Sequence, residues 1–332
     1  MATDYFPIID NMNTDWIEFL EKNSAIQTES NQETETICAL SNLAILKVSG
    51  KDSSQFLQGQ LACNINDLTN NNSFFSVFCN AKGRAITTLL ILKSEEGYLL
   101  VLPHQLIEKV SQKLRMYILR SDVQINDMSE THCLMGLTTN TPTLLTSLPE
   151  TDFAVSQQPE LAIKLPSLTS RYLIIATISQ ATSFWSQLTD KHNISPCSSQ
   201  KWDYQDISAG IPWLTLTSSE VYIPQMLNID KLGGISFNKG CYTGQEIIAR
   251  THYLGKAKRA LFIAECDINT NVDTDTQLMI DETTSSNSQI LSIQTNGQHK
   301  KLLIVMPTSD AELKNLTLNN SNQDKISIID FQ

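Results

Sequence analysis

The chain has 332 residues, of which 41% are hydrophobic, so it can build two or three domains with substantial cores. Its net charge of −11 argues against a protein that grips phosphate backbones over a wide surface, so direct nucleic-acid binding is not expected. No apolar run reaches the roughly 20 residues of a membrane span, and the start of the chain lacks the pattern of a secretory signal. Seven scattered cysteines without a C-x-x-C pair indicate a reducing, cytoplasmic compartment.

Strand and helix patterns mix over the first two thirds of the chain. The polar residues 21–36 read as part of an N-terminal arm. Strand patterns are found at 43–50, in a hairpin over 74–92, and at 98–102, 121–127 and 171–177. Helical patterns are found at 51–61, 103–120 and 183–188. This mixture predicts an α+β fold rather than a doubly wound parallel sheet.

The last part of the chain has mostly β patterns. Short strands separated by turn residues are expected at 257–266, 274–280, 288–297, 300–306 and 324–330. Several short strands at regular spacing are typical of a small barrel. We therefore expect the C-terminal part to form a β-barrel domain of its own.

One segment, FNKGCYTGQEIIAR at 237–250, differs from the polar sequence around it. Its T-G-Q-E run fits a capping box, in which the Thr243 side chain caps a helix and Glu246 reciprocates. The predicted helix covers residues 244–253. Glu246 and Arg250 lie four residues apart on it, in the orientation that favours an ion pair.

Cys241 lies just before this predicted helix, where the partial positive charge of the helix end favours a thiolate. Lys239 brings a second positive charge, and Gly240 allows another group to approach closely. This arrangement predicts that Cys241 is a functional thiol assisted by Lys239. The alternative is that Cys241 is a small buried hydrophobe, as free cysteines often are.

Trp202 is a second candidate site residue. It is followed by Asp203 and Tyr204, so its flat ring either belongs to the core or stacks on a heterocycle whose N–H groups meet these polar neighbours. Nucleotide-binding and hydrolase motifs such as G-x-G-x-x-G and G-x-S-x-G are absent. The five histidines lie far apart, and no metal site is predicted.

The segment GGISFNKGCYTGQEIIAR resembles the signature of the YgfZ family of folate-binding proteins. That family is related to the aminomethyltransferase, or T-protein, of the glycine cleavage system. The segments FLQGQL, NAKGR, KLRMYILRSDVQI, SAGIPW and YIPQMLNID agree with it in order and spacing, so the similarity covers residues 40–260. The positions that match the signature are Lys239, Gly240, Cys241, Tyr242, Thr243, Gly244, Gln245, Glu246 and Arg250.

The resemblance implies an aminomethyltransferase-like ring of three domains, with two intertwined ferredoxin-like α+β units and a small C-terminal β-barrel. The expected division is an arm at 1–36, two interleaved folate-binding subdomains at 37–253 and the barrel at 254–332. Tetrahydrofolate or a derivative is implied near the centre, with Trp202 in the place of a folate-associated aromatic residue.

Three positions depart from the related patterns. Leu43 stands where the family often has an aromatic residue. Compared with aminomethyltransferases, Cys241 replaces an acidic residue, and Ser208 stands near the place of a Glu. A carboxylate suits the paired N–H donors of a pterin, so its absence argues against efficient aminomethyl transfer.

The resemblance leads to a first functional reading and two alternatives. Members of the family support iron–sulfur enzymes, including enzymes that modify tRNA, and their signature Cys is held essential. The first reading is therefore a monomeric, cytoplasmic, folate-binding accessory protein for cluster assembly or repair, with iron–sulfur client enzymes as partners and no classical turnover. The main alternative is a folate-dependent aminomethyl transferase. A direct tRNA-binding module is disfavoured by the acidic balance of the chain.

Overall fold

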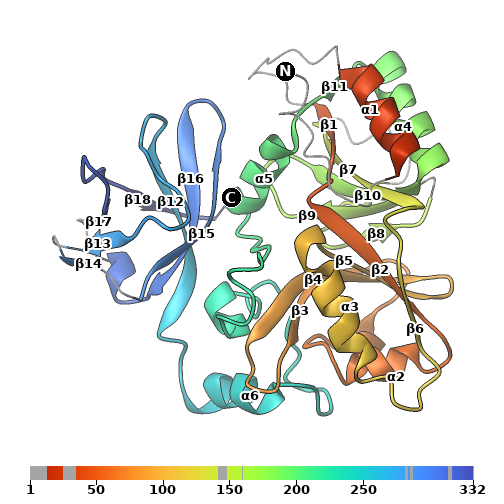
Figure 1. The fold of residues 1–332 in the computed structure, drawn as a ribbon, viewed down its shortest axis with the longest axis horizontal. Coiled ribbons are helices and arrows are strands. Elements are labelled where there is room, and N and C mark those ends of the chain that lie inside the picture. Colours follow the sequence, from red (N-terminus) through yellow and green to blue (C-terminus); the bar gives the residue numbers. More distant parts are fainter. Residues whose placement is uncertain are drawn as a thin grey trace.

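The fold is taken from a computed structural model that describes residues 13–24, 35–140, 148–158, 160–280, 283–284, 287–312 and 316–331. Within these residues, two α+β units and a C-terminal β domain surround the helix α5 (Ser199–Ser208), as Figure 1 shows. None of the described helices is long and apolar enough to cross a bilayer. The predicted α+β class and the separate β domain are confirmed.

The first unit is a five-stranded sheet in the order β3-β4-β5-β2-β6. Its strands are β2 (Leu43–Ser49), β3 (Ser73–Cys79), β4 (Ala85–Ser94), β5 (Gly97–Pro103) and β6 (Gln124–Asp127). Its helical segments are α2 (Ser53–Gln58), η1 (Ile65–Asp67), η2 (His104–Leu106) and α3 (Ile107–Arg115). The hairpin predicted over 74–92 is formed by β3 paired with β4. The helices predicted over 51–61 and 103–120 correspond to α2 and α3, and both are shorter than predicted.

The second unit is a six-stranded sheet in the order β11-β1-β7-β10-β9-β8. Its strands are β1 (Thr36–Ala39), β7 (His132–Thr138), β8 (Val155–Ser156), β9 (Leu161–Leu165), β10 (Arg171–Thr177) and β11 (Ser195–Pro196). Helices α1 (Thr14–Ser24) and α4 (Ile178–His192) lie side by side on it, as Figure 1 shows.

Helix α1 lies inside the segment predicted as an arm. The Asn13 side chain accepts a hydrogen bond from the backbone N–H of Asp15 at 2.9 Å and so caps the helix. Trp16 is only 2% exposed and meets Trp185 of α4 edge to face at 5.9 Å between ring centroids. Part of the arm is therefore packed into a core. The cap and the apolar pair Trp16 and Leu20, four residues apart, were its signals in the sequence.

The two units are interleaved along the chain. β1 belongs to the six-stranded sheet, the next strand β2 belongs to the five-stranded sheet, and the chain returns with β7. After α5 it returns once more, because the N–H of Ala85 on β4 donates to the carbonyl of Tyr222 at 2.8 Å. The predicted intertwining is thereby confirmed. It brings the signature segment against the five-stranded unit, where the N–H of Ser236 donates to the carbonyl of Ala62 at 2.9 Å.

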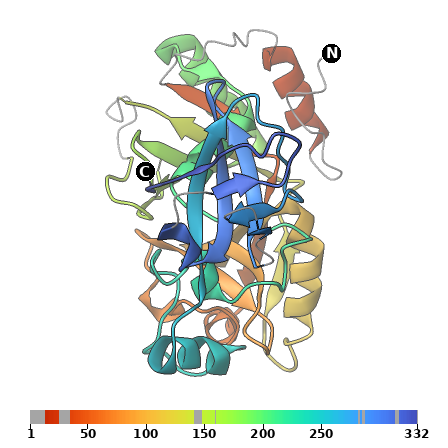
Figure 2. The ribbon, with the colours of Figure 1, turned by 90° about the vertical axis from the view of Figure 1, so that its left-hand side faces the viewer.

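The C-terminal domain contains two sheets that share one apolar core. The larger has the order β15-β16-β12-β18 and the smaller β14-β13-β17, and Figure 2 shows both facing the viewer. The strands are β12 (Arg259–Asp267), β13 (Leu278–Ile280), β14 (Thr283–Thr284), β15 (Gln289–Thr295), β16 (His299–Pro307), β17 (Leu316–Leu318) and β18 (Ser327–Ile329), with a short helix η5 (Asp310–Glu312).

Candidate functional site

The signature segment is fastened to the five-stranded unit by Lys239. Its ammonium group donates to the carbonyl oxygens of Leu61 at 2.8 Å and Cys63 at 2.7 Å, and it lies 5.0 Å from the centroid of the Tyr242 ring. Burial lowers the pKa of Lys239 to about 8. The described contacts of Lys239 thus anchor the loop, and its predicted assistance to the Cys241 thiol stays a prediction.

The predicted capping box is not formed. Helix α6 (Gln245–Leu254) begins one residue later than expected, and its N-cap is Gly244 in the left-handed region with φ of 84°. The Thr243 side chain instead lies 3.2 Å from Oε1 of Gln60, and its backbone N–H donates to the carbonyl of Gly59 at 3.1 Å. Thr243 therefore connects the loop to the end of α2 and does not cap helix α6. The predicted end of the helix near residue 254 is confirmed.

Two glycines from distant motifs interlock beneath the loop. A Cβ at Gly244 would lie 2.6 Å from the carbonyl oxygen of Asn80 and 2.9 Å from the Cα of Gly83. A Cβ at Gly83 would in turn lie 2.8 Å from the Ile247 side chain. The NAKGR turn of the hairpin and the start of α6 therefore touch backbone to backbone, which only glycine permits.

All seven cysteines lie among the described residues, and Cys241 is the one that is exposed. Five are buried, and Cys197 is intermediate. For Cys79 on the neighbouring hairpin, burial raises the pKa far above its usual range. The buried alternative for Cys241 is therefore wrong. Glu246 and Arg250 are also exposed, and no ion pair among the described residues joins them.

A central cavity of about 160 Å³ lies between the five-stranded unit, helix α5 with the segment after it, and the C-terminal domain. Leu43 contributes from β2, Asp203 from α5, Trp213 from the segment after α5, and Gln294 from β15. The cavity is thus assembled from segments of the chain that are far apart in sequence. Leu43, at the position where the family often has an aromatic residue, is one of its walls.

Polar groups at this cavity are arranged around Asp203. The Asn42 side-chain N–H donates to Oδ1 of Asp203 at 3.0 Å, and burial raises the pKa of Asp203 to about 7, with the nearby Asp206 as the second cause. The Asn42 Oδ1 atom is buried without a hydrogen-bond partner among the described residues. Such an acceptor is costly unless a ligand or water satisfies it.

Trp202 occupies a different place from the one its predicted role suggests. It is 2% exposed, and its ring packs so closely on Gly136 that a Cβ there would lie 2.4 Å from a ring carbon. The Arg171 guanidinium lies 4.8 Å from the ring centroid. The indole is a core residue here, and its contact with folate stays a prediction that requires a ligand to reach a covered ring.

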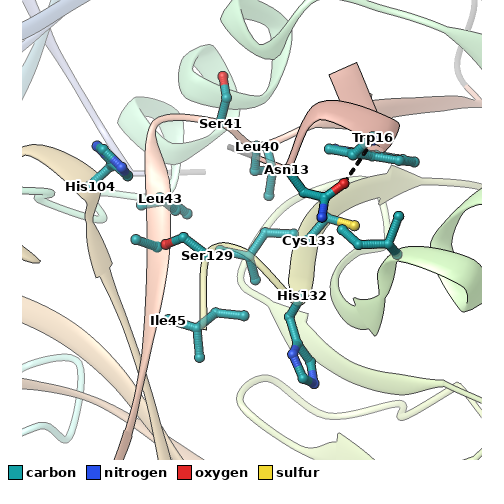
Figure 3. Close-up of a pocket in the computed structure, with 13 residues that line it drawn as sticks. Asn13, Trp16, Leu40, Ser41, Leu43, Ile45, His104, Ser129, His132 and Cys133 are labelled. Atoms are coloured by element: carbon teal, nitrogen blue, oxygen red, sulfur yellow. Dashed lines mark hydrogen bonds between the residues drawn. The ribbon is translucent and has the colours of Figure 1, made fainter. Parts of the chain in front are cut away.

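A second cavity, shown in Figure 3, lies near the start of α1, with Trp16, Leu43, His132 and Cys133 among its walls. Its volume of about 30 Å³ is on the order of two water molecules. Burial lowers the pKa of His132, which favours the neutral ring. This space is too small for a folate ring, so the central cavity is the better candidate. No group of three or more potential metal ligands occurs within the described ranges.

Comparisons with known proteins decide the family. The profile of the GCVT N-terminal domain matches residues 7–191. The tRNA-modifying protein YgfZ of Colwellia psychrerythraea is 34% identical over 229 residues, which cover 67% of this chain and 69% of that protein. The chain belongs to the YgfZ family. The YgfZ protein of Yersinia enterocolitica is 32% identical over 232 residues, covering 68% of this chain and 70% of that protein.

The structural comparison confirms the predicted architecture of this YgfZ family member. Glycine cleavage system aminomethyltransferase T from Bartonella henselae superposes with a TM-score of 0.72, covering 90% of this chain and 86% of that one. Sequence identity is 12%, so this likeness concerns the fold alone. The α+β ring with a C-terminal β domain is therefore the aminomethyltransferase fold.

Proposed function

We propose that this YgfZ family member is a folate-binding accessory protein that supports iron–sulfur cluster assembly or repair in client enzymes, including tRNA-modifying ones. The name of its relatives, tRNA-modifying protein YgfZ, supports a role in tRNA modification. The observation that carries the proposal is Cys241, the one exposed thiol, held at the surface by a loop fastened through Lys239 and Thr243. We further propose that it acts as a cytoplasmic monomer.

The exposed thiol suits contact with a cluster held by another protein. Iron–sulfur clusters are bound by several thiolates, usually four. Cys241 can supply one, and the client enzyme supplies the others, because the remaining cysteines here are buried or half-buried. Anchoring by Lys239 and Gly244 fixes the loop, so the thiol is presented without a cost in loop ordering when the client docks.

Tetrahydrofolate or a derivative fits the central cavity by its chemistry. A pterin edge carries N–H donors, and the cavity offers the Asp203 carboxyl and the unpartnered Oδ1 of Asn42 as acceptors. Its apolar wall includes Leu43 and Trp213. When bound, folate supplies one-carbon chemistry. The residues of the chain bind and orient its ring.

The aminomethyl transferase reading has weaker support. At Ser208, near the position where aminomethyltransferases carry a Glu, the hydroxyl oxygen lies 2.9 Å from the Lys301 ammonium. A buried Ser–Lys pair offers no carboxylate for a pterin edge. Incubation with tetrahydrofolate and an aminomethyl donor tests this reading, because formation of methylenetetrahydrofolate would favour the transferase.

The proposed role is tested in a deletion strain that lacks its YgfZ protein. The parent chain and Cys197→Ser are expected to restore cluster-dependent tRNA modifications, measured by mass spectrometry of nucleosides. Cys241→Ser is expected to fail although it accumulates to the same level. Cys197 is the matched control because it is the next most exposed thiol. Full restoration by Cys241→Ser would show that the thiol is dispensable and would reject the proposal.

A further inference from the structure

The geometry points to Trp213, rather than Trp202, as the ring on which a flat ligand stacks in the central cavity, with the buried pair Arg171 and Asp206 holding that ring in place. This inference rests on the proposed folate binding and names residues within that site. The pattern W-D-Y in the sequence drew attention to Trp202. The stacking surface that we infer lies eleven positions later, at the end of the SAGIPW segment, which covers residues 208–213.

Trp213 is the tryptophan that lines the central cavity. The chain has four tryptophans, and the other three are 1% or 2% exposed, whereas Trp213 is half-buried and lines the 160 Å³ cavity. Phe75 of β3 supports it edge to face, with ring centroids 4.9 Å apart and planes at 80°. Such an edge contact holds one side of an indole and leaves ring surface for a ligand.

The indole is also held through its polar atom. Its Nε1–H donates to Oδ2 of Asp206 at 2.9 Å, which fixes the rotation of the ring about its side-chain bonds. The other carboxyl oxygen of Asp206 lies 2.7 Å from the Arg171 guanidinium. The side chains of this pair are 5% exposed for Asp206 and 0% exposed for Arg171, so water cannot substitute for either partner.

Arg171 is itself immobilised by the core. Its Nε donates to the carbonyl of Pro166 at 3.1 Å, and its guanidinium packs over the face of Trp202. Trp202 therefore contributes indirectly, because its ring is the surface on which the Arg171 guanidinium packs. The chain of contacts runs from Trp202 through Arg171 and Asp206 to Trp213, and ends at the cavity.

The polar groups at the central cavity indicate which class of ligand fits against the Trp213 ring. Asp203 and the unpartnered Oδ1 of Asn42 are acceptors, so the ligand is a flat heterocycle that presents N–H donors along one edge. Trp213 supplies the stacking face for such a ring. A pterin combines both properties, and an aromatic ring without donors does not.

Fluorine NMR of the full chain labelled with 5-fluorotryptophan tests the stacking role. The four signals are assigned with single Trp→Phe variants and followed during titration with tetrahydrofolate. The Trp213 signal is expected to shift most, while the Trp16 and Trp185 signals stay in place. Trp213→Ala is expected to weaken binding about tenfold, and Trp213→Phe to recover most of that loss. A shift at Trp202 with none at Trp213 would overturn the inference.

The holding role is tested in the ligand-free protein. Asp206→Asn and Arg171→Lys are expected to shift or broaden the Trp213 signal and to leave Trp16 and Trp185 unchanged, which reports an intact second core. An unmoved Trp213 signal in a variant with intact Trp16 and Trp185 signals would refute the pair's role. If the parent binds no folate by calorimetry, the proposed function fails and the stacking role with it, whereas the ligand-free spectra still decide the role of Asp206.

Discussion

Replacing Gly244 by Ala should disrupt the junction between the signature loop and the NAKGR turn. Gly244 has a φ of 84°, a region that costs an L-residue about 1–2 kcal/mol. The added Cβ would also lie 2.6 Å from the carbonyl oxygen of Asn80 and 3.2 Å from the Cβ of Cys79. Both neighbours belong to the hairpin of the buried five-stranded sheet, so they cannot move aside cheaply.

The glycines of the same segment separate these two costs. Gly240 has neither an unusual φ nor any atom within 4 Å of its added Cβ, Gly233 has a φ of 73° with open space, and Gly234 has only the clash, at 2.0 Å from the Phe75 carbonyl oxygen. Relative to Gly240→Ala, we expect losses of about 1–2 kcal/mol for Gly233→Ala and about 1–3 kcal/mol for Gly234→Ala. For Gly244→Ala the two terms together give about 2–5 kcal/mol.

Urea unfolding followed by circular dichroism measures the free energy of unfolding for the four variants. Each Gly→Ala substitution reduces the conformational entropy of the unfolded chain, which stabilises the folded state by about 0.4–1 kcal/mol. This contribution is common to the four variants, so it cancels when they are compared. If Gly244→Ala is as stable as Gly240→Ala, the close contact between the two motifs does not exist in solution. If it matches Gly233→Ala, the hairpin yields and only the backbone term acts.

Three further predictions concern the site. Cys241 should be alkylated first of the seven cysteines by a limiting reagent, as read by peptide mass spectrometry, and faster labelling of any other would contradict its exposure. Burial raises the pKa of Asp203 to about 7, above its unfolded value, so the contribution of this carboxyl to stability is complete below about pH 4 and is lost as the pH rises towards 7. Asp203→Asn should therefore flatten the pH dependence of the melting temperature, and an unchanged slope would point to another group. Thr243→Ala should lower the free energy of unfolding by about 1 kcal/mol through the lost contact with Gln60, and Gln60→Ala should make that loss non-additive, whereas additive losses in this double-mutant cycle would contradict the contact.

Local sequence patterns determined most of the secondary structure. The hairpin over 74–92, the strand at 171–177 and the helix that ends near residue 254 formed as predicted, because alternation, turn residues and helix ends act between neighbours. The signature also drew attention to Cys241, and exposure of this thiol agrees with the functional reading.

Contacts between distant segments decided the rest. Thr243 has the sequence of a helix cap, yet it bonds to Gln60, since the end of α2 lies beside it and Gly244 meets the hairpin turn. The sequence singled out Trp202, and only the fold shows how differently Trp202 and Trp213 are placed. Trp202 is covered by Gly136 and Arg171, whereas Trp213 is turned to the cavity by Asp206. Burial and partner choice are set by residues that only the folded chain brings together, which a local pattern does not encode.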